Sequence, residues 1–183
     1  MICSCEDSIT KLKYETDSCC TFGGNYLVHG SPKQRLVSVG QTHADALARA
    51  IEFFEYASSS AQEFKVTYCI EPLSIDQTPI INKMSEAVEI VEKIRSPYLK
   101  TMLDTSSAGL TESISIPELI HQFMPTGHIA HVQLNDPNRR GPGQGEMQFG
   151  PILQALKTNN YIGELAIEPF EYLPDGPTCA AQS

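Results

Sequence analysis

Two near copies of one short motif, residues 70–73 (Ile-Glu-Pro-Leu) and 167–170 (Ile-Glu-Pro-Phe), decide how this sequence is interpreted. Each copy follows an apolar run typical of a buried strand, over residues 65–69 and 163–166. Because proline cannot donate to a sheet ladder, it marks the end of each strand. The motif therefore predicts Glu71 and Glu168 at the carboxyl ends of strands, where parallel sheets and barrels carry their functional residues. The alternative is that the two glutamates are unrelated and only meet solvent.

Length and composition describe an ordinary globular domain. The chain has 183 residues, of which 41% are hydrophobic and 19% are charged. Its net charge of -9 argues against nucleic acid or an anionic membrane as the main partner, and no apolar run reaches the ~20 residues of a membrane span. We see no secretory signal, and the six scattered cysteines form no paired C-x-x-C motif. A cytoplasmic protein with free thiols is the expectation.

Predicted strands and helices alternate along the rest of the chain. Strands are expected over residues 25–29, 65–71, 99–104, 129–134 and 163–168. Helices are expected over residues 1–20, from residue 42, and over 82–94, 115–123 and 152–156. The helix from Thr42 places Leu47, Ile51 and Phe54 on one apolar face. This alternation predicts a parallel α/β architecture.

Four of the predicted strands end in a polar side chain, at intervals of roughly 30 residues, the length of a βα unit. These residues are Glu71, Asp104, Gln133 and Glu168. Together they would form an oxygen-rich site suited to Mg²⁺ or Mn²⁺; His131 lies on the same strand face as Gln133, and a histidine ligand would shift the preference toward Mn²⁺, Co²⁺ or Zn²⁺. Such a site could stabilise an enediolate while carboxylates on either side of a substrate exchange a proton with it. The alternative is that these residues only cap loops.

Four segments together resemble the sugar phosphate isomerase/epimerase superfamily. Within it, they are most similar to the ketose 3-epimerase and hydroxypyruvate isomerase branch of the xylose isomerase-like TIM barrels. The segments are residues 69–73 (Cys-Ile-Glu-Pro-Leu), 100–105 (Lys-Thr-Met-Leu-Asp-Thr), 135–145 (Asn-Asp-Pro-Asn-Arg-Arg-Gly-Pro-Gly-Gln-Gly) and 167–170. The similarity runs from about Cys19 to the C-terminus, and residues 27–32 fit the family's preceding strand and turn.

The resemblance implies a role for each strand-end residue. The family's metal ligands fall on Glu71, Asp104, Gln133 and Glu168, and the two glutamates are also its acid/base pair. Arg139 matches an arginine that contacts substrate oxygens. Three positions depart from the family.

The departures concern the third metal ligand and two substrate positions. Gln133 stands where the family usually has histidine, Gln77 where the epimerases have glutamate, and Ser107 where they have histidine. We therefore expect weaker binding of a divalent metal than in the epimerases. We also expect an altered substrate contact set, made up of Arg139, Gln77, Ser107 and His131.

A complete (β/α)₈ barrel takes ~250 residues, so residues 1–183 are expected to form a single partial TIM-barrel domain. The resemblance identifies its strands as the last five of eight, without the first strands and the closing helix. The open barrel edges predict self-association or a complementing chain.

The sequence leaves three hypotheses for the function. The first is a Mn²⁺- or Mg²⁺-dependent isomerase or epimerase of a small ketose, hydroxy-ketoacid or sugar phosphate. The second is a non-catalytic remnant or one half of a split barrel. The third is a metal-dependent abasic-site endonuclease, which would require more histidine ligands and a basic surface.

Overall fold

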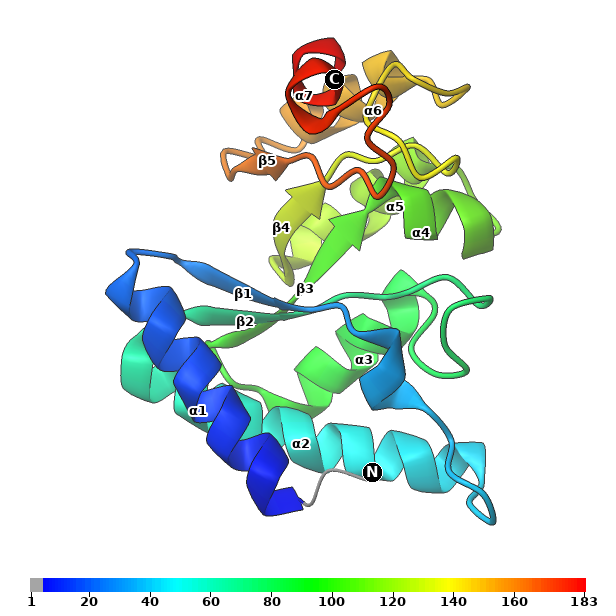
Figure 1. Ribbon diagram of the computed structural model, residues 1–183. Coiled ribbons are helices and arrows are strands. Elements are labelled where there is room, and N and C mark those ends of the chain that lie inside the picture. Colours follow the sequence, from blue (N-terminus) through cyan, green and yellow to red (C-terminus); the bar gives the residue numbers. More distant parts are fainter. Residues whose placement is uncertain (1–4) are drawn as a thin grey trace.

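The computed structural model describes residues 5–183, and within them a single sheet of five parallel strands curves into half a barrel (Figure 1). The strands are β1 (Tyr26–His29), β2 (Thr67–Ile70), β3 (Leu99–Asp104), β4 (Ile129–Gln133) and β5 (Leu165–Ala166). They are hydrogen-bonded in the order β1-β2-β3-β4-β5, and every neighbouring pair is parallel. At least one helix connects each strand to the next. The predicted partial α/β barrel of five strands is confirmed.

The helices are α1 (Cys5–Thr21), α2 (His43–Phe64), α3 (Met84–Ile94), α4 (Thr105–Thr111), α5 (Ile116–Phe123), α6 (Phe149–Thr158) and α7 (Gly176–Gln182). Short 3-10 turns cover Pro32–Arg35 and Met124–Thr126. The first four residues of the helix predicted over 1–20 lie outside the described residues. Helices α4 and α7 were not predicted from the sequence. None of the described helices is long and apolar enough to cross a membrane.

The predicted helix starts are confirmed at their caps. The Thr42 hydroxyl accepts a hydrogen bond from the Asp45 N–H at 3.2 Å, and the Asp45 carboxylate accepts one from the Thr42 N–H at 2.8 Å. Ser115 and Glu118 form the same reciprocal pair at the start of α5. Such capping boxes satisfy N–H groups that the first helical turn leaves unpaired, so local sequence alone sets both starts.

Two hydrophobic clusters hold the helices to the outer face of the sheet. The first joins α1, α2 and α3 to β1, β2 and the start of β3, and the second joins α3, α5 and α6 to β3 and β4. Phe54 of the first cluster and Ile120 of the second are fully buried. Leu47 of α2 is exposed, although it shares a predicted apolar face with Phe54.

The last strand differs from its prediction. β5 is only two residues long, and Leu165 is 44% exposed, whereas the sequence predicted a buried strand over residues 163–168. That prediction of burial was wrong because β5 pairs with β4 alone, and no other strand in residues 5–183 covers its far edge. The edge of the half-barrel is therefore open and partly apolar.

Candidate active site

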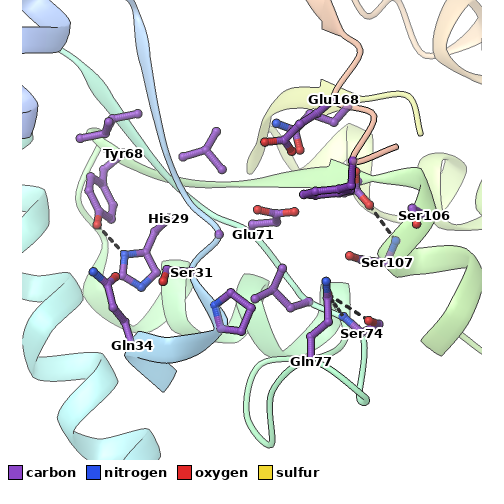
Figure 2. Close-up of a pocket in the computed structure, with 18 of the residues that line it drawn as sticks. His29, Ser31, Gln34, Tyr68, Glu71, Ser74, Gln77, Ser106, Ser107 and Glu168 are labelled. Carbon is purple, nitrogen blue, oxygen red and sulfur yellow. Dashed lines mark hydrogen bonds between the residues drawn. The ribbon is translucent and has the colours of Figure 1, made fainter. Parts of the chain in front are cut away.

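The carboxyl ends of the strands surround a cavity of about 1000 Å³. Its lining includes all four strand-end residues singled out in the sequence, Glu71, Asp104, Gln133 and Glu168. Figure 2 shows Glu71 and Glu168 among the side chains around the cavity. Each lies at the end of its strand or within two residues of it, so the parallel arrangement brings together side chains that are far apart in the sequence. The structure thus gathers the predicted constellation in one cavity.

Glu71 follows β2 directly and is buried. Its backbone carbonyl accepts a hydrogen bond of 2.6 Å from the guanidinium of Arg35, which is itself buried. Burial raises the pKa of the Glu71 carboxyl to about 8; nearby Asp104 and Glu168 add to the increase, and Arg35 partly opposes it. Without a cation, Glu71 therefore holds its proton at neutral pH.

Gly30 gives the Glu71 side chain the space it occupies. A Cβ atom on residue 30 would overlap a carboxylate oxygen of Glu71. Glycine at this position therefore leaves the Glu71 carboxylate in place, whereas a larger residue would require that side chain to move. The residue belongs to the segment 27–32 that the sequence analysis related to the family.

Asp104 ends β3 and caps α4. Its Oδ1 accepts a hydrogen bond from the Ser107 N–H at 2.7 Å, and its Oδ2 accepts one from Asn135 Nδ2 at 2.5 Å. Burial raises the pKa of the Asp104 carboxyl, while these hydrogen bonds limit the increase. Both carboxylate oxygens are therefore oriented by neighbours rather than free to turn.

Gln133 ends β4 and lies beside Asp104 in the parallel register. The side chain is buried, and its Oε1 has no hydrogen-bond partner. A buried amide oxygen without a partner costs free energy, so it marks a position where a donor or a cation would be stabilised. This atom is the clearest indication that the cavity is built to hold a ligand.

Glu168 lies two residues beyond β5 and is more exposed than the other three. Its backbone N–H donates to Asn135 Oδ1 at 2.7 Å. Partial burial and the nearby Asp104 carboxylate raise the pKa of the Glu168 carboxyl. Glu71 and Glu168 thus approach one cavity from strands that are not neighbours, as an acid/base pair on either side of a substrate would require.

Three of the four predicted substrate residues also line the cavity: Arg139, Gln77 and Ser107. The Gln77 side-chain oxygen accepts hydrogen bonds from the Ser74 hydroxyl at 3.0 Å and from the Ser74 N–H at 3.3 Å (Figure 2). This pairing orients the Gln77 amide within the loop that follows β2.

His131 is placed differently. It is not among the residues that line the cavity, and its ring stacks on Tyr26 with 5.7 Å between ring centres. It shares a strand face with Gln133, as predicted, but is two residues farther from the carboxyl end. Burial lowers the pKa of the His131 imidazole. This placement does not support a direct contact with substrate.

The donor atoms suit a hard divalent cation, because three carboxylates and an unpartnered amide oxygen share one cavity. Burial raises the pKa of the Glu71 and Glu168 carboxyls, and repulsion from neighbouring carboxylates adds to the increase; a bound cation would relieve that repulsion. Among the side chains described, however, no three from His, Cys, Asp and Glu are close enough to share a metal ion. The donor types fit a metal, but the carboxylates would have to move closer together to ligate it.

Two buried residues that the sequence analysis did not single out support this site. Asn135 contacts both Asp104 and Glu168, and Arg35 contacts Glu71. Asn135 stands two residues after Gln133 in the glycine-rich segment that carried the resemblance, and this position was the one available signal. Arg35 gave none, because an arginine in a polar turn is normally exposed.

Comparison with known proteins agrees with this arrangement. Residues 4–182 match the family described as xylose isomerase-like TIM barrel. The chain belongs to this family. It is 32% identical over 123 residues to the D-psicose 3-epimerase of Enterocloster bolteae and 31% identical over 123 residues to that of Agrobacterium fabrum. Each match covers 67% of this chain, but only 40% and 42% of the respective relative. The matched region is thus less than half of either epimerase.

Solved structures show the same fold in a larger form. A crystal structure of a D-psicose 3-epimerase in the presence of D-fructose superposes with a TM-score of 0.78 and 24% identity, covering 90% of this chain and 57% of that one. The crystal structure of the 3-keto-D-glucoside 4-epimerase of E. coli superposes with a TM-score of 0.80 and 16% sequence identity. This match covers 95% of this chain and 66% of that one. At these identities the likeness shows the fold alone. This xylose isomerase-like chain is a partial barrel.

Proposed function

We propose that this chain carries the catalytic half of a divalent-metal-dependent sugar epimerase or isomerase. The observation that carries the proposal is the convergence of Glu71 and Glu168 on one cavity from β2 and β5, which are not neighbours in the sheet. The kinship with D-psicose 3-epimerases supports a small ketose as substrate, with a hydroxy-ketoacid or a sugar phosphate as alternatives.

The chemistry is a proton exchange at a carbon next to a carbonyl. One glutamate removes the proton as a carboxylate, the electron pair moves into an enediolate, and the other glutamate returns a proton from the opposite face. Atoms and charge balance if one glutamate starts protonated and the other ionised. The raised pKa of Glu71 describes the metal-free chain, because a bound cation would favour the ionised carboxylate.

A Mn²⁺ or Mg²⁺ ion bound here would stabilise the negative charge of the enediolate. Glu71, Asp104, Gln133 and Glu168 would hold it. The amide oxygen of Gln133 suits a hard ion but binds transition metals more weakly than an imidazole does. Metal dependence is therefore part of the proposal, with modest affinity.

Substrate oxygens would meet Arg139, Gln77 and Ser107. Arg139 offers a planar set of donors to hydroxyl and carbonyl oxygens. Ser107 is smaller than the histidine of the epimerases, so it leaves more room at that side of the cavity. Substrate preference is therefore expected to differ from that of the D-psicose 3-epimerases.

The test is solvent deuterium exchange. The chain is incubated with D-psicose or D-fructose and Mn²⁺ in D₂O, and incorporation of deuterium at C3 is followed by NMR. We expect incorporation, a higher melting temperature with Mn²⁺, and loss of both in Glu168→Gln. Absence of any thermal shift at millimolar Mn²⁺ would refute the metal-dependent site.

The second candidate is a chain that is inactive by itself, either a remnant or one half of a split barrel. The observation that favours it is the open edge at β5 with its exposed Leu165, together with a match to less than half of each epimerase. In that case a complementing segment, or a second copy, would cover the edges. Full activity of the 183-residue chain alone would exclude this candidate.

A further inference from the structure

One buried side chain joins two of the carboxylate-bearing segments. Asn135 lies at the start of the loop after β4 and has no exposed surface. Its Nδ2 donates to Asp104 Oδ2 at 2.5 Å, and its Oδ1 accepts from the Glu168 N–H at 2.7 Å. The two partners also fix the orientation of the amide, because a carboxylate needs a donor and an N–H needs an acceptor.

The backbone of Asn135 is held equally firmly. Its N–H donates to the Thr105 hydroxyl at 2.8 Å, and the same hydroxyl donates to its carbonyl at 2.7 Å. Thr105 follows Asp104 in the chain and is itself fully buried. Every polar group of Asn135 is thus paired with a residue next to the site, so the side chain has one accessible arrangement.

The Glu168 segment needs such support because β5 is so short. After Leu165 and Ala166, the ladder to β4 ends with the hydrogen bond from the Leu134 N–H to the Ala166 carbonyl at 2.8 Å. Beyond it, the only hydrogen bond described for the backbone of Glu168 is the one to Asn135. The next backbone hydrogen bonds along the segment are those of Phe170 and Glu171 to the Arg139 carbonyl, so the Asn135 side chain is the contact that fixes Glu168 itself.

We infer that Asn135 is a positioning residue that sets the placement of Glu168 relative to Asp104 across the cavity. Its catalytic meaning rests on the proposed function, whereas the placement itself does not. A purely structural role would mean that Asn135 fills space and stabilises the fold as a whole. If Asn135 positions Glu168, removing its amide should loosen the backbone at Glu168 alone. If Asn135 only stabilises the fold, removing the amide should loosen the whole sheet.

The experiment measures amide hydrogen exchange by NMR in the metal-free, ¹⁵N-labelled chain. The variants are Asn135→Ala, which removes both hydrogen bonds, and Asn135→Asp, which keeps an oxygen for the Glu168 N–H. The matched control is Asn159→Ala, because Asn159 also makes two side-chain hydrogen bonds but lies away from the cavity.

We expect Asn135→Ala to speed exchange at Glu168 by about tenfold, with β1 to β4 unchanged. Asn135→Asp should restore most of the protection at a pH low enough for its carboxyl and that of Asp104 to share a proton. For a chain that exchanges deuterium into a ketose, kcat of Asn135→Ala should fall by about tenfold or more with little change in KM, because a displaced base affects the chemical step rather than binding. Asn159→Ala should leave the Glu168 exchange and both constants unchanged.

The two hypotheses fail in different ways. If the wild-type chain is inactive but Asn135→Ala still loosens Glu168 locally, the positioning role stands and the proposed function falls. If exchange at Glu168 is unaltered in Asn135→Ala, the inference is overturned, whether or not the chain is active. Uniformly faster exchange throughout the sheet would also overturn it, since Asn135 would then be a general stabilising residue.

Discussion

The guanidinium carbon of Arg139 lies 4.6 Å from the centre of the Phe170 ring, and the carbonyl oxygen of Arg139 accepts hydrogen bonds from the N–H groups of Phe170 and Glu171 at 2.9 and 3.0 Å. One residue of the loop after β4 thus holds the segment after Glu168 by both its side chain and its backbone. To do so, Arg139 adopts a φ of 70°, in the left-handed region that residues other than glycine seldom occupy. Such a conformation is maintained against a local cost.

Replacement of Arg139 should separate this backbone cost from the function of the side chain. Arg139→Ala and Arg139→Gly both remove the guanidinium, but only glycine adopts a positive φ without strain. We expect Arg139→Gly to be more stable than Arg139→Ala by about 1 kcal/mol in urea unfolding. Deuterium exchange into a ketose should be reduced in both, mainly through a higher KM. Equal stability of the two variants would contradict the assigned strain.

Gly30→Ala should disturb the site from beneath Glu71. The added methyl group overlaps a carboxylate oxygen, so the carboxylate must move and the Mn²⁺-dependent rise in melting temperature should shrink or vanish. The control is Gly150→Ala in the first turn of α6, where an added Cβ meets no atom within 4 Å. That change should stabilise the chain slightly, by up to ~1 kcal/mol, because alanine favours helix. An unchanged metal response in Gly30→Ala would contradict the close packing.

Glu71 should make the metal-free chain less stable as pH rises. The folded-state pKa of Glu71 is raised to about 8 from an ordinary value of 4.5, so the folded state binds this proton more tightly than the unfolded state. The stabilising contribution is fully present below about pH 4.5 and is lost as pH rises through 8. Glu71→Gln should therefore weaken the dependence of the free energy of unfolding on pH. It should also stabilise the metal-free chain at pH 8 to 9, by on the order of 2 kcal/mol. The control is Glu63→Gln, at an exposed position of α2 where the change removes no buried carboxyl group.

Gln133→His should strengthen metal binding. Imidazole binds transition metals more tightly than an amide oxygen does, and the position already faces the cavity beside Asp104. We expect about a tenfold lower Mn²⁺ dissociation constant, measured by titration of free Mn²⁺. Gln133→Leu is the opposite change, because it removes a buried oxygen without a partner. It should stabilise the apo chain by about 1 kcal/mol and abolish the metal response. Equal Mn²⁺ affinity in wild type and Gln133→Leu would exclude Gln133 as a ligand.

Local sequence patterns predicted much of the fold. Proline after a strand, capping boxes at Thr42 and Ser115, and regular strand spacing are all signals carried by a few adjacent residues. The gathering of Glu71 and Asp104 into one cavity followed from those elements and from parallel topology. The burial expected for β5 failed because burial of an edge strand depends on a neighbour that a local pattern cannot reveal.

The residues that support the site, Asn135 and Arg35, could not be predicted from the sequence for a related reason. Asn135 and Arg35 act through partners about 30 or more positions away in the chain. Only the folded arrangement shows that one amide reaches both Asp104 and Glu168. For His131, strand alternation predicted the correct face of the sheet. It did not predict that the ring would stack on Tyr26 instead of lining the cavity. Alternation predicts a face, not a depth.

The open edge of β5 leads to the last prediction, which concerns what covers it. Exposed apolar side chains at Leu165 and Ile167 border a strand with an unpaired edge, the arrangement that favours strand addition or association. We expect the chain alone to associate with rising concentration, measured by analytical ultracentrifugation. Ile167→Lys should reduce this association, whereas Leu153→Lys, at a similarly exposed position on α6, should not.

Fusion to a segment that supplies three further βα units should suppress association and raise epimerase activity together, because the same strands would pair with the edge and enclose the cavity. If the chain alone stays monomeric at all concentrations, the edge of β5 does not drive association. If the fusion suppresses association without a gain in activity, the inactive remnant is favoured.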